Sequence, residues 1–258
     1  MALIVLISNQ KGGVGKTTTA VNLATALAAV KKRVLLVDID PQSNATTGLG
    51  IVSTQKGSSY DLLIRNKNLS EIMLKSVIPG LMVVPSNINL IGAEVELVQE
   101  PEREFILKHA FEAYNEIFDY IIVDSPPSMG ILTLNGLVAA DGVIAPLQCE
   151  YYAVEGINYL VDSVRRVKAS FNPKLRIFGL LLTMYDKRSA LSLSISNEVH
   201  TKFKGQVFNT VIPRNIKISE SQSHGKPVLI YDVKCPGAIA YMNLAREFLE
   251  KARQSKWQ

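Results

Sequence analysis

The stretch ALIVLISNQKGGVGKTT, residues 2–18, decides the fold of this chain. Its apolar first part predicts a buried strand, the glycines that follow predict a tight loop, and a helical pattern begins at Lys16. Glycines allow successive backbone N–H groups to point inward, and a helix N-terminus adds positive potential, so such a loop fits a polyphosphate. In this interpretation Lys16 holds the β- and γ-phosphates and Thr17 ligates Mg²⁺. We therefore expect a nucleotide to bind at Gly12, Gly13, Val14, Gly15, Lys16, Thr17 and Thr18.

The rest of the chain repeats the order of strand and helix. Its apolar runs do not alternate with polar residues, which is typical of strands in a parallel sheet that helices cover on both faces. We therefore predict a doubly wound α/β fold with a mostly parallel sheet, in a single domain over residues 1–258. The segment 189–196 alternates like an exposed strand but also fits helical spacing, and we favour the helix. The expected strands are 2–7, 33–37, 81–84, 120–123, 142–146, 176–182 and 207–212, and the expected helices are 16–30, 103–115, 131–139, 154–171 and 238–253.

Composition and charge restrict the class of protein. Of the 258 residues, 47% are apolar and 20% are charged, which excludes a disordered or fibrous chain. The two cysteines cannot form a disulfide framework, and the uncharged stretch 125–140 is shorter than the ~20 residues of a membrane helix, so we expect a soluble cytoplasmic protein. Residues 1–129 hold 11 basic and 13 acidic side chains, whereas residues 130–258 hold 17 and 10. The basic surplus of the second half points to a polyanionic partner, with solubility as the alternative.

A second lysine opens the glycine loop. The strict P-loop pattern has a glycine where Gln10 stands in this chain, and Lys11 follows it. A further cation is most effective where charge develops on the γ-phosphate. Because Lys11 lies at the strand side of the loop, the nucleotide of a neighbouring subunit is a better target for it than its own. A solvated surface lysine is the alternative.

Carboxylates follow two of the apolar runs. Asp38 and Asp40 alternate along an extended chain, so they share one face at the carboxyl end of a strand, where parallel sheets bind ligands. Capping of a helix or loop is the alternative role. Asp124 ends the run at 120–123, and after a phosphate loop such an aspartate predicts a carboxylate that holds Mg²⁺ directly or through water.

The arrangement K-G-G-x-G-K-T-T at residues 11–18 resembles the deviant Walker A family of ATPases, and the whole chain is similar to the ParA/Soj branch of chromosome and plasmid partition proteins. The resemblance implies a Mg²⁺-dependent ATPase that forms a homodimer around ATP. It implies that Lys11 contacts the ATP of the partner subunit, while Lys16 and Thr17 keep their usual roles. It further implies that Asp40 orients or activates the attacking water, and we assign Asp38 to support around Mg²⁺ or its waters.

Two further regions gain a role from the same resemblance. The segment 210–215 is similar to the one that flanks the adenine, so we expect Pro213 to pack on the purine and Asn215 to hydrogen-bond its edge; a plain strand-to-loop turn is the alternative. Arg188 and Lys217 fall at places where related ATPases bind double-stranded DNA without sequence preference, and a solvated surface is the alternative for each.

The leading hypothesis is a partition ATPase whose ATP-bound dimer coats nucleoid DNA. A ParB-like centromere-binding protein would stimulate hydrolysis and release it. The alternatives are a MinD-like ATPase on the membrane and an orphan ParA-type ATPase that positions another cargo. A lipid-binding tail is a basic amphipathic helix, but here Glu247 and Glu250 accompany the basic residues near the C-terminus, so we expect no stable membrane association.

Overall fold

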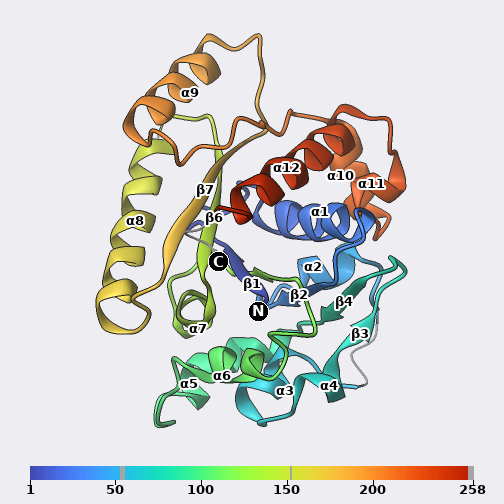
Figure 1. Cartoon of the computed structure of the whole chain (residues 1–258), viewed down its shortest axis with the longest axis vertical. Coiled ribbons are helices and arrows are strands. Elements are labelled where there is room, and N and C mark those ends of the chain that lie inside the picture. The colour runs from blue at the N-terminus through green and yellow to red at the C-terminus, as the bar shows by residue number, and fades with distance from the viewer. Residues whose placement is uncertain (53–55, 152, 255–258) are drawn as a thin grey trace.

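The computed structural model describes residues 1–52, 56–151 and 153–254. Its strands are β1 (Leu3–Ile7), β2 (Val34–Asp38), β3 (Leu74–Lys75), β4 (Leu81–Val84), β5 (Tyr120–Asp124), β6 (Gly142–Gln148) and β7 (Arg176–Thr183). They form one sheet in the order β3-β4-β2-β5-β1-β6-β7 (Figure 1). Every neighbouring pair is parallel except β3 with β4. The first strand of the chain therefore lies inside the sheet, between β5 and β6.

Helices cover both faces of this sheet. The longer ones are α1 (Lys16–Ala29), α6 (Ile106–Glu112), α7 (Ile131–Ala139), α8 (Ala153–Ser170), α9 (Ala190–Lys202), α10 (Ile216–Ser223) and α12 (Pro236–Ala252). The short ones are α2 (Asn44–Gly48), α3 (Ser59–Ile64), α4 (Leu69–Ile72), η1 (Ile88–Gly92), α5 (Ala93–Glu96) and α11 (Val228–Tyr231). The short elements have no counterpart among the predicted ones.

The two hydrophobic cores meet at β1, whose five residues are all buried. Leu3, Val5 and Ile7 pack in the core that contains α1, α11 and α12. Ile4 and Leu6 pack in the other core, with α6, α7 and α8. Because both faces of the strand are covered, its sequence shows no polar alternation. The predicted doubly wound, mostly parallel α/β fold is confirmed.

The prediction of a strand at 207–212 is wrong, because the described chain makes only an isolated bridge to β7 there. The chain runs beside β7 there, and the N–H groups of Phe208 and Ile212 donate to carbonyls of that strand at 2.9 and 2.8 Å. Between these points the N–H groups of residues 209–210 donate to the carboxylate of Glu247 on α12, at 2.7 and 2.9 Å. A side chain thus takes the donors that a continuous ladder would use.

Two helix predictions have different outcomes. The segment 189–196 is helical, as predicted, since α9 begins after Ser189, whose hydroxyl accepts the N–H of Ser192 at 3.2 Å. The helix expected over 103–115 is shorter than predicted, because tertiary contacts hold its first residues. The guanidinium of Arg103 donates to a carbonyl outside the helix at 2.6 Å, and the amide of Asn135 on α7 donates to the Arg103 carbonyl at 2.7 Å.

The apolar face of the C-terminal helix α12 is used inside the fold. Tyr241, Leu244 and Phe248 are buried against α1 and the sheet. That face is therefore not exposed to a lipid surface. Within the part of the chain that the structure describes, no helix combines the length and the apolar character needed to cross a membrane.

Candidate active site

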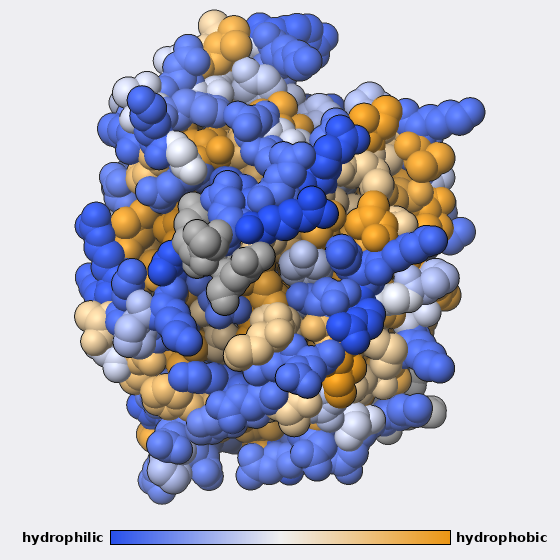
Figure 2. All heavy atoms as spheres, in the orientation of Figure 1, coloured by the Kyte–Doolittle hydropathy of each residue, from blue (hydrophilic) through white to orange (hydrophobic). Residues whose placement is uncertain are grey.

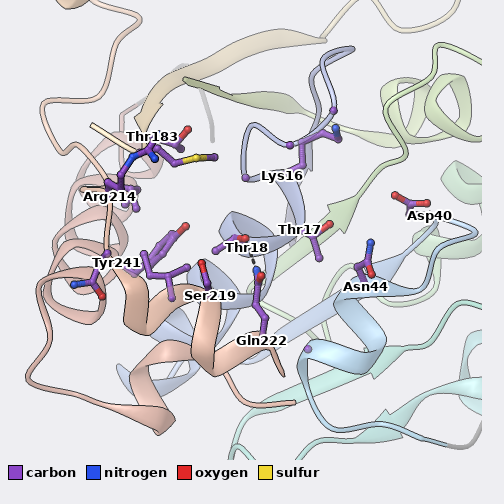
Figure 3. A pocket seen from close by; sticks show the side chains of 18 of the residues that line it. Lys16, Thr17, Thr18, Asp40, Asn44, Thr183, Arg214, Ser219, Gln222 and Tyr241 are labelled. Carbon is purple, nitrogen blue, oxygen red and sulfur yellow. Dashed lines mark hydrogen bonds between the residues drawn. The ribbon is translucent and has the colours of Figure 1, made fainter. Parts of the chain in front are cut away.

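A cavity of about 650 Å³ lies where the loops after β1, β2 and β7 meet. Its opposite wall is the segment 212–222, which includes most of α10 (Ile216–Ser223) (Figure 3). Val14 of the glycine loop is buried, and neither it nor Lys11, Asp38 or Asp124 is among the lining residues. The predicted residues that do line the cavity are Gly12, Gly13, Gly15, Lys16, Thr17, Thr18, Asp40, Pro213 and Asn215.

The glycine loop has the conformation that its sequence predicts. The φ angles are 76° at Gly13 and 90° at Gly15, in the left-handed region that favours glycine. Gly15 is also the N-cap residue of α1, which has no side-chain cap and no acidic residue in its first turn. The positive end of α1 is therefore left for an anion in the cavity.

Lys16 is the cation of this cavity that is closest to the glycine loop. It is 6% exposed, and its Nζ donates to the Lys11 carbonyl at 3.2 Å. Burial lowers the pKa of its ammonium, while the carboxylates of Asp124 and Asp40 act in the opposite direction. The ammonium is thus folded over the loop, where it faces whatever the loop binds.

Asp38 at the end of β2 is occupied by protein donors. It accepts hydrogen bonds from Thr46 N at 2.9 Å, Thr46 Oγ1 at 2.7 Å and Asp40 N at 3.1 Å. Burial raises the pKa of Asp38 to about 6, although these hydrogen bonds lower it. Thr46 Oγ1 also accepts the N–H of Ser86, at 2.9 Å. Asp38 therefore joins β2, α2 and the loop after β4.

Asp124 at the end of β5 lies beside Asp38 in the register of the sheet. Both of its carboxylate oxygens are buried, and neither has a hydrogen-bond partner among the described residues. Burial raises the pKa of this carboxyl well above its usual range, the charge of Asp38 raises it further, and the Thr17 hydroxyl and Lys16 lower it. Orphaned carboxylate oxygens near a hydroxyl oxygen fit a hard divalent cation, which would satisfy them.

Asp40 stands at the edge of the cavity beside the loop (Figure 3). It is 6% exposed, and its Oδ1 accepts the N–H of Gln42 at 2.9 Å. Its carbonyl accepts the hydroxyl of Ser86 at 2.6 Å. Backbone and side chain are therefore both fixed, with the carboxylate facing the cavity.

The far end of the cavity combines apolar and amide groups. Pro213 and Asn215 line it, and Asn215 Oδ1 is buried without a partner among the described residues. Met184 has a φ of 49°, an uncommon value for a residue with a side chain. Arg214 of the segment 210–215 also lines this end. The other lining residues here lie outside the sequence motifs and come from three separate segments: Thr183, Met184, Ile218, Ser219, Gln222 and Tyr241.

Lys11 lies outside its own cavity. Its backbone N–H donates to Asn9 Oδ1 at 3.0 Å, and Asn9 in turn donates to the Pro146 carbonyl of β6 at 2.7 Å. Its ammonium forms an ion pair with Glu150, just after β6, and both side chains are 44% exposed. Lys11 is thus fixed through its backbone while its ammonium points to an acidic neighbour at the surface.

The two residues predicted to bind DNA each have a local acidic partner. Arg188 contacts Asp186 through two nitrogens, both at 3.2 Å. Lys217 Nζ lies 2.8 Å from Glu220 on α10. The N–H of Arg214 donates to the Tyr185 carbonyl at 3.2 Å. The chain just before Arg188 therefore lies beside the chain just before Lys217.

The fold and the cavity define a P-loop nucleoside triphosphatase. A family model described as an AAA domain matches residues 2–177. The chain is 48% identical to the chromosome partitioning protein ParA of Caulobacter vibrioides, over 98% of this chain and 97% of that one. It is 50% identical to the sporulation initiation inhibitor protein Soj of Bacillus subtilis, over 96% and 98%. The chain therefore belongs to the ParA/Soj family of chromosome-partitioning ATPases.

Two solved structures of similar proteins contain a bound nucleotide. The cobyrinic acid a,c-diamide synthase from Mycobacterium smegmatis, with bound ADP and magnesium, has a TM-score of 0.85 and 36% identity, covering 97% of this chain and 95% of that one. A plasmid partition protein from Borrelia burgdorferi, bound to AMPPNP, has a TM-score of 0.85 and 25% identity, covering 97% and 100%.

Proposed function

We propose that this ATPase is Mg²⁺-dependent and that two protomers close on ATP, bind DNA without sequence preference, and separate when a ParB-like partner stimulates hydrolysis. The observation that carries the proposal is the cavity itself, in which the glycine loop, Lys16 and Asp40 lie at one end and Pro213 with Asn215 at the other. Its two ends match a triphosphate and a base. The proposal places the protein in the cytoplasm, on the nucleoid.

At the phosphate end, each side chain has one task. The N–H groups of the loop and the Lys16 ammonium bind the β- and γ-phosphates. The Thr17 hydroxyl and the Asp124 carboxylate hold Mg²⁺, which supplies charge neutralisation on those phosphates when it is bound. The unpartnered oxygens of Asp124 support this assignment. Asp38, whose oxygens are already bonded to Thr46 and Asp40, positions this edge of the site rather than ligating the metal itself.

Hydrolysis is assigned to Asp40. A carboxylate at the edge of the cavity can accept a proton from a water molecule. The lone pair of that water's oxygen is then directed at the γ-phosphate. The hydrogen bond from the Gln42 N–H holds the carboxylate in place, which supports this role. At the other end Pro213 packs on the adenine, and the unpartnered Asn215 Oδ1 accepts from its amino group.

Lys11 acts on the nucleotide of the other protomer. Its absence from the lining of its own cavity and its exposure at the surface support a role in trans. To reach the partner, its ammonium must leave Glu150. Exposed ion pairs contribute only about 0.2–1 kcal/mol, so this exchange has a small cost compared with a contact to a developing phosphate charge.

DNA binding is assigned to the segments of Arg188 and Lys217. Replacing both by alanine should flatten the dependence of log K on log salt by about one unit per lost phosphate contact, hence about four units for a dimer. The measurement is retention on non-specific double-stranded DNA over a salt series, with ATP and with ADP, where only ATP should support binding.

The matched control replaces Arg165 and Lys202, which are also exposed cations with acidic partners on their own helices. That variant should keep the slope of the unchanged protein. If the Arg188 and Lys217 variant keeps it too, the DNA surface lies elsewhere, and equal binding with ADP contradicts a nucleotide switch.

A further inference from the structure

A hydrogen bond joins the two walls of the cavity. Gln222 on α10 donates from Nε2 to the hydroxyl of Thr18 on α1, at 2.5 Å, although the two residues are 204 positions apart in the chain (Figure 3). Both side chains line the cavity. None of the motifs in the sequence includes Gln222, and the roles assigned above leave it unused.

The chain that follows α10 is also fixed to α1, at the first residue of α11. The N–H of Val228 donates to Asn22 Oδ1 at 2.8 Å, and Asn22 Nδ2 donates to the Thr18 carbonyl at 2.8 Å. Asn22 lies one turn after Thr18 on α1. The amide of Gln222 is therefore held next to the first turn of α1, even though its side chain is exposed to the cavity.

The side chains of α10 that line the cavity are uncharged. Ile218, Ser219 and Gln222 are its lining residues, whereas Glu220 turns to Lys217 and to the hydroxyl of Tyr231. Because Glu220 does not line the cavity, α10 offers the cavity an amide and a hydroxyl but no carboxylate, and such a face suits an anionic acceptor. Gln222 is the donor of α10 that reaches the phosphate loop.

The position of Gln222 fits one part of a nucleotide. Figure 3 shows Lys16 and Asp40 on one side of the cavity and Arg214 on the other, with Thr18 and Gln222 between them. The first side is the γ-phosphate end of the proposed site, and the base end is where Pro213 and Asn215 flank Arg214 in the chain. A nucleotide that spans the cavity passes this point with the phosphate nearest its sugar. We propose that Gln222 is a nucleotide-binding residue whose amide donates to the α-phosphate, in place of its hydrogen bond to Thr18. This inference rests on the proposed nucleotide site.

Binding of ADP, AMP and adenosine to three proteins tests the proposal. Because a hydrogen bond to a charged acceptor contributes about tenfold to a binding constant, Gln222→Ala should weaken ADP and AMP by about 3- to 10-fold and leave adenosine unchanged. Gln222→Glu keeps the size of the side chain but places a carboxylate beside the phosphate. Its affinity for ADP should be lower than that of the alanine variant, and the difference between the two affinities should shrink as the salt concentration rises.

The matched controls are Gln206→Ala and Gln206→Glu, at an exposed glutamine outside the cavity lining, and both should bind like the unchanged protein. Equal melting temperatures without nucleotide show that the Gln222 variants are folded. Unchanged ADP and AMP affinity overturns the inference, and so does an equal loss for adenosine, which would place the contact on the sugar or base. If Lys16→Ala also binds ADP normally, the proposed nucleotide site itself is wrong. If the Gln222 variants bind ADP normally but Lys16→Ala does not, the nucleotide site is supported and only the Gln222 contact is wrong.

Discussion

Lys16→Ala protein should bind ATP and ADP about 100-fold or more weakly than the unchanged protein. The ammonium lies over the glycine loop and is the buried cation of the cavity lining, so its removal takes the buried positive charge away from the phosphates. Truncating one partner of a desolvated charged pair costs about 2–5 kcal/mol, which is a factor of about 30 to several thousand in affinity. Titration calorimetry with each nucleotide measures the change.

A control at the surface separates this effect from a general change of charge. Lys75 on β3 is exposed and is not part of the cavity lining, so Lys75→Ala should bind nucleotide normally. The folded state of Lys16→Ala should be intact, because the Nζ has one hydrogen bond, to the Lys11 carbonyl. An affinity near that of the unchanged protein would remove the phosphate role from Lys16.

Asp40→Ala protein should keep ATP but hydrolyse it about 100- to 10,000-fold more slowly, the range by which a positioned general base accelerates a reaction. Removing a carboxylate from beside the phosphates should not weaken the binding of ATP, because it also removes the repulsion between the carboxylate and the phosphates. The ATP-bound dimer should then accumulate on DNA. Single-turnover hydrolysis and DNA retention after addition of ATP measure the two effects.

Asp40→Asn distinguishes the base from the scaffold. The asparagine keeps the size of the side chain and an oxygen for the Gln42 N–H, but it is a poor base. It should be as slow as the alanine variant and as stable as the unchanged protein. Turnover within a few-fold of normal in Asp40→Asn would assign activation of the water to another group.

Elements governed by local sequence were predictable. The run from β1 through the loop into α1 has its signals within 2–18, because the strand, the left-handed glycines and the start of the helix are neighbours in the chain. The acidic partners of Arg188 and Lys217 were also within reach, since they lie two and three residues away. Pairs at a spacing of three on a helix face each other.

Elements governed by distant contacts were not predictable. The segment 207–212 has the composition of a strand, but the carboxylate of Glu247, more than 30 residues later, takes two of its donors. Lys11 meets Glu150 across 139 positions, and Gln222 meets Thr18 across 204. No local pattern reports such a meeting, because each depends on how the sheet brings the loops together.

The trans role of Lys11 has a direct test in a mixture of two variants. Lys11→Ala protein keeps its own nucleotide site but offers no lysine to a partner. Lys16→Ala protein should bind nucleotide too weakly to hydrolyse it at its own site, but it still carries Lys11. We expect each variant to be inactive alone and ATP hydrolysis to return on mixing, rising with the amount of Lys16→Ala protein until it saturates. If the rate of the mixture is only the sum of the two separate rates, Lys11 does not act across the dimer.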